Sequence, residues 1–435
     1  MTVIRRPVWC AAAVAAAMAL GPTTGSFAQG GMRPDPRAGA NAIVPLRTAP
    51  IERLTVNPGF RDWGPATLTE TTLLAGNATN KGGLFAVDLA SGRLKWSARP
   101  VGTRSGAPFV ATAPAVSGHA VIAPMGNTLV AVSAVTGKEL WRGPNTELGA
   151  AAAAGGGLAF VLGEDGFFRA LDAATGRERW KLQFAQFKAC RSRPVVRDGV
   201  VYVSRGVRLA EATPNGPARH MRYLVALDAA TGQERWRHVH APTRSSTGAC
   251  LGQPIVTADT LFGFDDEEST LYAINLANGR DRWAPLVVQR AVEGRQRPVA
   301  VGGLVDAGPV VIGVSRTLLI AFDKATGRTA WEIPGQYSDT APSTAVAGRV
   351  LYFQGHPGAA PAAEVQDRIV YVGGKPVTPA PVLPGGRLNA LDLETRALLW
   401  SFSRPTAEPN WSFGHVTAVD GGLWVDTYQA LIKLQ

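Results

Sequence analysis

The chain has 435 residues and a formal net charge of +11, and its apolar content of 46% is that of a globular protein rather than a disordered one. Only 18% of the residues are charged, whereas Gly and Pro number 49 and 31, a mixture that favours many short strands joined by turns. The length allows two or three ordinary domains, but a long all-β protein can also form a single one.

The first 28 residues have the features of a secretory signal peptide. Arg5 and Arg6 form a basic start, an apolar run follows from Val8 to Leu20, and Ser26-Phe27-Ala28 supplies small residues at a cleavage site. A transmembrane anchor is the alternative, but the run is too short to span a bilayer. We therefore expect cleavage near Ala28, a periplasmic or secreted protein, and no transmembrane segment in the mature chain.

The charged residues among residues 1–28 are Arg5 and Arg6, so cleavage removes two positive charges and the mature net charge is +11 − 2 = +9. A basic excess attracts nucleic acid, anionic lipid or acidic protein surfaces. An exported protein rarely meets nucleic acid, so we expect no nucleic-acid partner. Residues 29–50 are expected to form a flexible N-terminal segment, and residues 51–435 a single domain.

One thirteen-residue pattern dominates this domain. Its first copy runs from Leu84 to Trp96, with Ala at the third place of every copy and Gly at the ninth place of all copies except the last, which has Arg396. The copies end at Trp96, Trp141, Trp180, Trp236, Trp283, Trp331 and Trp400. A period of about forty-five residues fits four short strands per unit.

Each copy of the pattern predicts a hairpin. In the third copy the first five residues alternate like a strand, Asp172 and Thr175 favour a turn, and Gly176 supplies the positive φ of a tight turn. The strand then resumes and ends at Trp180. A hairpin by itself cannot bury such a face, so we expect the tryptophan of one unit to dock on the invariant Ala of a neighbouring unit.

The end of the chain predicts the number of units. The segment Leu431 to Gln435 matches the start of the pattern and then stops, which leaves an eighth unit without its outer strand. The segment Ile51 to Pro58 has strand character and can supply that strand, which closes the ring. The sequence therefore predicts an all-β fold, an eight-bladed β-propeller of four-stranded blades with tryptophan-docking motifs, closed by an N-terminal strand. Seven blades with a frayed tail is the alternative.

The pattern Ala-x-Asp-x-x-Thr-Gly-x-x-x-Trp resembles the repeat of the pyrroloquinoline-quinone (PQQ) type propellers, and the resemblance covers roughly residues 51–435. It implies the propeller fold. It leaves the activity open, because this superfamily includes PQQ-dependent dehydrogenases as well as the non-enzymatic outer-membrane protein assembly factor B, which is closest in size. The repeat itself is a packing device and carries no cofactor chemistry.

The irregular segments of the sequence fall on one expected face of the propeller. Insertions at about Arg205–Met221 and Gly355–Arg387 lie in links of that face, and binding loops concentrate where a rigid scaffold presents variable segments. Inter-blade links on the same face carry the cations Lys188, Arg191, Arg193, Arg244, Arg295 and Arg297. These cations form either a solvated rim or an anion-binding mouth for an acidic loop or a carboxylated ligand.

Signals of catalysis and metal binding are weak. The chain contains no CxxCH, HExxH or GxSxG motif. His415 stands by itself on the inner strand of the last blade, which favours a structural role. The run Asp265 to Glu268 favours a solvated acidic loop over a metal site, because the EF-hand spacing is absent. We therefore name no catalytic residue and no metal ligand, and we leave the cofactor-binding residues open.

The two cysteines of the mature chain are expected to form a disulfide. Cys190 and Cys250 each stand four residues before a proline, Pro194 and Pro254, that opens an inner strand. They therefore occupy equivalent places in consecutive blades, in a compartment that permits oxidation. Two unpaired thiols packed as small apolar residues are the alternative.

These patterns favour a periplasmic binding or scaffold protein that resembles assembly factor B. It would hold a protein partner, such as an outer-membrane assembly component, through the face with the insertions, and no cofactor is expected. The alternative is a small PQQ-dependent dehydrogenase of alcohols or sugars that binds PQQ with calcium.

Overall fold

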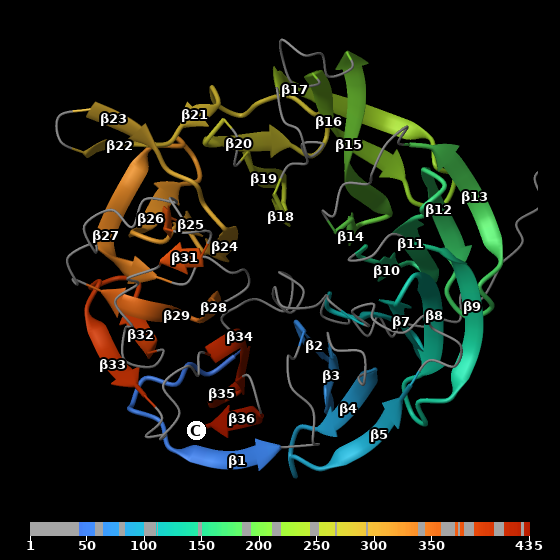
Figure 1. The fold of residues 1–435 in the computed structure, drawn as a ribbon, viewed down its shortest axis with the longest axis horizontal. Coiled ribbons are helices and arrows are strands. Elements are labelled where there is room, and N and C mark those ends of the chain that lie inside the picture. Colours follow the sequence, from blue (N-terminus) through green and yellow to red (C-terminus); the bar gives the residue numbers. More distant parts are fainter. Residues whose placement is uncertain are drawn as a thin grey trace, which may run out of the picture.

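Eight four-stranded blades form a ring around a central axis, in chain order from β2 to β36 (Figure 1). The computed structural model describes residues 43–56, 64–77, 83–99, 110, 112–146, 150–184, 193–210, 219–243, 252–265, 268–292, 295–337, 344–357, 370–372, 375–377, 387–403, 413–427 and 430–435. Within these ranges every regular element is a strand, and no helix there is long and apolar enough to cross a membrane. The prediction of an all-β, eight-bladed propeller is confirmed.

The strands of each blade pair antiparallel in chain order, from the channel outward. The first four blades consist of β2 (Thr67–Leu68), β3 (Thr72–Gly76), β4 (Leu84–Asp88) and β5 (Leu94–Ala98); β6 (Ala115–Ser117), β7 (Ala120–Met125), β8 (Thr128–Ser133) and β9 (Glu139–Asn145); β10 (Ala153–Gly155), β11 (Leu158–Leu162), β12 (Phe167–Asp172) and β13 (Glu178–Gln183); and β14 (Val195–Arg197), β15 (Val200–Ala210), β16 (Arg219–Asp228) and β17 (Glu234–Thr243).

The last four blades follow the same plan. They consist of β18 (Ile255–Val256), β19 (Thr260–Asp265), β20 (Thr270–Asn275) and β21 (Leu286–Val287); β24 (Gly303–Ala307), β25 (Val310–Val314), β26 (Leu318–Asp323) and β27 (Thr329–Tyr337); β28 (Thr344–Ala347), β29 (Val350–Pro357), β32 (Leu388–Asp392) and β33 (Leu398–Phe402); and β34 (Phe413–Val419), β35 (Gly422–Thr427), β36 (Leu431–Leu434) and β1 (Glu52–Val56). Two further hairpins stand outside the blades: β22 (Gln289–Val292) with β23 (Arg295–Pro298), and β30 (Val370–Val372) with β31 (Lys375–Val377).

The sequence of each strand reflects its distance from the channel. Strands in the middle of a blade, such as β3 and β19, are buried on both faces, because a neighbouring blade covers each face. Their central residues are therefore apolar, and polar residues stand at the strand ends. The outer strand β5 alternates exposed and buried residues, with Trp96 and Ala98 turned inward. The core is accordingly a series of layers between blades rather than one central cluster.

The repeated tryptophans join each blade to the next. The Trp96 indole donates a hydrogen bond to the Ala134 carbonyl of the following blade, at 2.8 Å. The same bond recurs in the next four blades: Trp141 to Ala173, Trp180 to Ala229, Trp236 to Leu276 and Trp283 to Lys324. The indole also covers the turn glycine of the following blade, since a Cβ added at Gly137 would lie 2.7 Å from the Trp96 ring. The glycine is required by this contact and by its φ of +69°.

The invariant alanine has a different partner from the one that the pattern predicts. Ala131 lies directly opposite Trp141 of its own blade, and Ala170 lies opposite Trp180 in the same way. Trp96 of the preceding blade packs instead beside Val130 and Val132. The alanine is small because a tryptophan crosses over it from the next strand of the same sheet.

The N-terminal strand closes the ring. Strand β1 pairs with β36, with Glu52 opposite Leu434 and Val56 opposite Leu431. Leu54 of β1 replaces the missing tryptophan of blade eight, because its side chain covers the turn Gly92 of blade one.

The chain before β1 is also packed. The Leu46 carbonyl accepts the Trp400 indole at 3.0 Å, and the Leu46 amide donates to the Tyr352 hydroxyl at 2.7 Å. In the other blades, the indole donates to a carbonyl in the turn between the third and outer strands of the following blade. Blade eight has no such turn, because its outer strand is β1, and the Leu46 carbonyl takes this role for Trp400. The packed chain therefore begins before residue 51, in the stretch 29–50 that the sequence pattern assigned to a flexible segment.

Replacement of Trp180 with Ala should lower the free energy of unfolding by about 3–5 kcal/mol. The indole packs 5.9 Å from the rings of both Phe160 and Phe168, and its removal leaves a cavity between blades three and four. Chemical denaturation would measure the change. Leu140→Ala is the matched control, since this outer-strand residue is 47% exposed, and its loss should cost about 0.5 kcal/mol or less. Equal effects of the two substitutions would contradict the docking interpretation.

A chain that starts at Arg61 should melt at a clearly lower temperature than one that starts at Gln29. The truncation removes β1 and Leu46, which leaves the outer edge of β36 unpaired and the Trp400 indole without its acceptor. Thermal unfolding of the two chains would test this, and equal melting temperatures would show that the N-terminal strand does not hold the ring closed.

Candidate functional site

Successive strands run in opposite directions, so the links between second and third strands lie on the same face as the links between blades. This face is called the insertion face below. Strands β15 and β16 extend their pairing on it as far as Ala210 and Arg219, so the blade-four insertion is a lengthened hairpin. The outer strand β27 of blade six continues there and pairs with β29 of blade seven, with Tyr337 opposite Gly355.

Arg193 lies at the mouth of the channel on this face. Its Nε donates to the Ala152 carbonyl at 3.0 Å and its Nη2 lies 3.5 Å from the Pro114 carbonyl, while its own amide and carbonyl bond the Gln253 side chain at 3.0 and 3.2 Å. Pro114 O also accepts the Thr67 hydroxyl at 2.6 Å. These bonds join the inner edges of blades one to five. Burial lowers the pKa of Arg193 to about 10, and the side chain remains charged at neutral pH.

The contacts of Arg193 give it a structural role that the sequence pattern did not indicate. The sequence pattern placed its guanidinium either on a solvated rim or in an anion-binding mouth, whereas in the structure it donates to backbone carbonyls of blades two and three. Of the other predicted cations, Arg295 and Arg297 lie on β23, and Arg297 is exposed. Lys188, Arg191 and Arg244 lie outside the described residues, and so do Cys190 and Cys250 with their predicted disulfide.

A polar wedge lies between blades four and five, on the side of the insertion face. Nearer the opposite face the same interface is apolar and contains Tyr202, Leu224 and Trp236. The wedge consists of seven side chains: Ser204, Arg222, His238, His240, Asp265, Tyr272 and Asp281.

Arg222 and Asp265 form the most buried ion pair of the wedge. They are 1% and 0% exposed, and Arg222 Nη1 lies 2.5 Å from Asp265 Oδ1. Because the two residues belong to different blades, the pair links β16 to the end of β19. Asp265 was predicted to lie in a solvated acidic loop, and this prediction is wrong for Asp265, which points inward to a buried arginine.

The histidines of the wedge form a directed hydrogen-bonded chain. His238 Nε2 lies 2.9 Å from Asp281 Oδ1, and His238 Nδ1 lies 3.3 Å from His240 Nε2. When the Nε2 atoms of both rings carry hydrogen, His238 donates to Asp281 and its Nδ1 accepts from His240. The His240 ring packs edge-on against Tyr272, with centroids 4.4 Å apart. Burial lowers the pKa of His240 to about 3, and the charges of His238 and Arg222 act in the same direction.

The segment Trp236 to His240 contains a sequence signal for this wedge that was missed. Alternation along β17 places Trp236, His238 and His240 on the face toward blade five, where His240 is 2% exposed. The intervening Val239 is 54% exposed. A strand that buries histidine and exposes valine reverses the usual pattern, and it indicates a polar interface rather than a solvent face.

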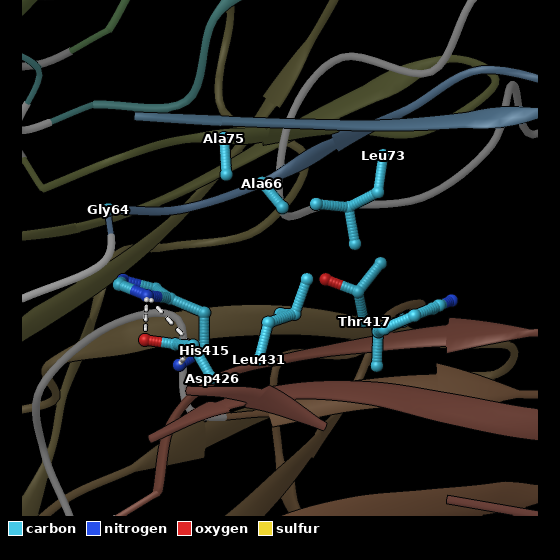
Figure 2. A pocket seen from close by; sticks show the side chains of 9 residues that line it. Gly64, Ala66, Leu73, Ala75, His415, Thr417, Asp426 and Leu431 are labelled. Atoms are coloured by element: carbon cyan, nitrogen blue, oxygen red, sulfur yellow. Dashed lines mark hydrogen bonds and ion pairs between the residues drawn. The ribbon is translucent and has the colours of Figure 1, made fainter. Parts of the chain in front are cut away.

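A pocket lies at the seam where blade eight meets blade one (Figure 2). Its lining consists of Gly64, Ala66, Leu73, Ala75, His415, Thr417, Trp424, Asp426 and Leu431. His415 and Asp426 are the titratable residues of this lining, and they contact each other: Nδ1 of His415 lies 3.3 Å from the carboxylate, and the His415 amide donates to Asp426 Oδ1. Burial raises the pKa of the Asp426 carboxyl, and the bonds from His415 oppose this shift.

The histidine–aspartate pair holds the innermost strands of blade eight together. Strand β34 has an irregular register between Phe413 and Val416, and Asp426 of β35 bonds the backbone in this interval. A Cβ added at Gly414 would lie 2.1 Å from Asp426 Oδ2, so only glycine permits the carboxylate to come this close. His415 therefore has a local structural partner at the seam.

The family described as outer membrane protein assembly factor BamB matches residues 43–284 and 220–367, which together cover most of the propeller. The chain belongs to this family. The matched residues include repeats of this chain whose tryptophans dock on the following blade.

Other comparisons extend the likeness to proteins with different names. The serine/threonine-protein kinase AfsK of Streptomyces coelicolor (strain ATCC BAA-471 / A3(2) / M145) is 28% identical over 349 residues, 77% of this chain and 40% of the kinase. AfsK of Streptomyces griseus is 32% identical over 162 residues, 36% of this chain and 17% of the kinase. The chain thus spans less than half the length of these two relatives.

Solved structures share the fold at low identity. BamB from Moraxella catarrhalis superposes with a TM-score of 0.56 at 14% identity, over 89% of this chain and 98% of that one. A europium-containing methanol dehydrogenase gives the same TM-score and identity, over 86% of this chain and 84% of the enzyme. The BamB family and the dehydrogenases therefore have the same ring, and the ring does not distinguish their activities.

A PQQ site of the dehydrogenase type would also hold calcium. Calcium takes six to eight oxygen ligands, several of them carboxylates. Among the residues whose positions are described, no group of three or more His, Cys, Asp or Glu side chains is arranged to hold a metal ion. The Asp426 carboxylate beside the channel is occupied by the His415 amide and ring.

The stability of the protein should fall between about pH 6.5 and pH 4, because of His240. In the unfolded chain this ring takes up a proton near pH 6.5, whereas in the folded chain its pKa is about 3. Its contribution to stability is thus fully present above pH 6.5 and is lost as the pH falls toward 3. The slope should be about 1.4 kcal/mol per pH unit for this one group.

Denaturant titrations at a series of pH values would measure this slope in the wild type and in His240→Gln. The variant should lose the part of the slope that comes from one proton. His119→Gln, at an exposed turn, controls for the loss of a histidine and should keep the wild-type slope. An unchanged slope in His240→Gln would show that this ring does not couple folding to pH.

Proposed function

We propose that this protein is a binding and scaffold propeller of the cell envelope, which grips a protein partner through the insertion face in the assembly of outer-membrane proteins. Membership of the assembly factor B family supports the scaffold role. The predicted signal peptide in residues 1–28 supports a periplasmic location, where this assembly begins. The proposed role requires no cofactor.

The observation that carries the proposal is the difference between the two faces of the ring. On the face opposite the insertions, the turns are short and repeat one design: Asp172 Oδ1 accepts the Thr175 amide at 3.0 Å and its hydroxyl at 2.8 Å, and Asp228 holds Thr231 in the same way at 3.0 Å. These turns differ little from blade to blade, so they give a partner little to recognise.

The insertion face has the opposite character. The β15–β16 hairpin, the β22–β23 hairpin and the β27–β29 pairing each extend a different link, and each has a different sequence. A rigid ring with variable extensions on one face is the usual arrangement of a binding scaffold. The wedge and Arg193 tie blades one to five together just below these extensions, so the extensions stand on a fixed base.

Site-specific photo-crosslinking in the cells of origin would test the proposal. A photo-reactive amino acid at Gln296, which is exposed on the insertion face, should form an adduct with a component of the outer-membrane protein assembly machinery. The same amino acid at Val135, which is 70% exposed in a turn of the opposite face, is the matched control and should form none. Deletion of the gene should also lower the abundance of outer-membrane β-barrel proteins.

Two results would contradict the proposal. Adducts that form only from Val135 would place the partner on the wrong face. Unchanged outer-membrane protein levels after deletion, together with no assembly component in any adduct, would exclude the assembly role.

A further inference from the structure

We propose that the β22–β23 hairpin binds an acidic, extended segment of a protein partner, with Arg290 and Arg297 pairing with its carboxylates and a strand edge receiving its backbone. The inference rests on the proposed function for the partner being a protein held at the insertion face. It adds which element makes the contact and what chemistry the partner must have.

The hairpin is fixed at its base and free above it. Val288 and Val299 flank it and are 3% and 8% exposed in the core between blades five and six. The Val299 amide donates to the Val288 carbonyl at 3.0 Å, and the Val288 amide donates to the Ser269 carbonyl at 2.7 Å. Above this base, β22 and β23 pair only with each other, and the hairpin projects from the rim of the ring (Figure 1).

The two arginines lie directly opposite each other. Register pairs Arg290 with Arg297, so their side chains leave the same face of the hairpin. Arg297 is exposed, and Arg290 is partly exposed. Two like charges in directly opposed positions destabilise a strand pair. The folded protein by itself gains nothing from this arrangement, whereas a carboxylate placed between the guanidinium groups would remove the repulsion.

Neither arginine has an acidic partner among the described residues. Glu268 is exposed in the turn beside the base of the hairpin, and no ion pair joins it to Arg290 or Arg297. Some exposed arginines elsewhere form ion pairs with nearby carboxylates: Arg142 with Glu139, Arg179 with Asp172, Arg235 with Asp228, Arg237 with Glu234, and Arg282 with Asp259. Other exposed arginines, such as Arg177 and Arg328 in turns of the opposite face, are single and have no ion pair among the described residues.

The register separates Arg290 and Arg297 from these single exposed arginines. Two guanidinium groups leave one face of the hairpin together, in directly opposed positions. The two strands of the hairpin carry Arg290, Arg295 and Arg297 and no acidic residue, and Glu293, between the strands in the sequence, lies outside the described residues. A guanidinium is the group that pairs with carboxylates through two parallel hydrogen bonds, so the missing partners are most simply carboxylates from another molecule.

The backbone of the hairpin favours an extended peptide over a lipid surface. A two-stranded sheet has an unpaired edge on each strand, and such an edge can accept a further strand through main-chain hydrogen bonds. Val287 is 51% exposed at the base of β22 and offers an apolar contact beside the charged residues. The partner segment should therefore be an extended strand that pairs through its main chain, with carboxylates on alternate residues and an apolar side chain for the contact with Val287.

The test uses the whole mature chain and a labelled peptide of about ten residues with alternating Glu and Val, which supplies carboxylates at the spacing of one strand face. Fluorescence anisotropy should show binding that weakens as salt rises. Arg290→Glu combined with Arg297→Glu should weaken the affinity about tenfold or more, because both attractions become repulsions.

The matched control is Arg179→Glu combined with Arg235→Glu. Both residues are exposed on outer strands, 59% and 45%, and the change in net charge equals that of the hairpin variant. The control should keep the wild-type affinity. Equal weakening by the two variants would overturn the proposal, because net charge would then explain the binding. Thermal unfolding should show that both variants remain folded.

Two further probes separate the remaining explanations. The same peptide with alternate backbone amides methylated keeps its charge and loses its donors, and it should bind more weakly; equal binding would overturn strand addition. Vesicles that contain anionic phospholipid should not bind in an Arg290- and Arg297-dependent way. Such lipid binding without peptide binding would replace the proposal with a membrane contact.

The inference and the proposed function can fail separately. If the peptide binds through the hairpin, but no adduct contains an assembly component and deletion leaves outer-membrane protein levels unchanged, the assembly role is wrong and the acidic-strand site stands. If the crosslink forms but neither the peptide nor the arginine variants have the expected effect, the face is right and the hairpin contact is wrong.

Discussion

The contact on which this fold depends is the one between the indole of one blade and the turn glycine of the next. Each blade is a narrow sheet that has two apolar faces and cannot bury either by itself. The indole fixes the spacing between blades because it covers the glycine and bonds a carbonyl of the same turn, as Trp141 does with Gly176 and Ala173. Strand pairing thus determines the blade, and this contact determines the ring.

The places where the pattern changes show what the contact requires. Leu54 covers Gly92 where blade eight has no tryptophan, and the Leu46 carbonyl accepts Trp400 where no turn follows. Both replacements come from the chain before blade one, so one N-terminal segment completes the packing layers on both faces of blade eight. In the seventh repeat Arg396 stands in place of glycine at a φ of +60°, which shows that the turn keeps its backbone shape even when the residue disfavours it.

The repeat made the ring predictable, and the residues that differ between repeats limited what else could be predicted. Seven copies of one motif determine the blade plan, and the strand character before Arg61 predicts the closure. The partner of the invariant Ala was wrong, because sequence spacing does not say whether an indole lies over its own sheet or the next one. Arg193 and Asp265 were misinterpreted for a related reason, because each bonds to another blade: Arg193 to the Ala152 carbonyl and Asp265 to Arg222. In the sequence, a charged residue near a link looks solvated, because the neighbouring blade that buries it is far away along the chain.

Charged side chains are buried in the wedge and exposed on the β22–β23 hairpin, and this difference explains how a ring can serve as a scaffold. Inside the wedge, Arg222 and His240 are removed from water: Arg222 pairs with Asp265 of the adjacent blade, whereas His240 bonds His238 of its own strand and packs against Tyr272 of the adjacent blade. These contacts make the interface of blades four and five specific in geometry. On the hairpin, Arg290 and Arg297 stay at the surface and face each other. The buried polar interface keeps blades four and five in one position, and this gives the insertion face a rigid base. Arg290 and Arg297 are therefore oriented before a partner arrives, and the binding loses less conformational entropy.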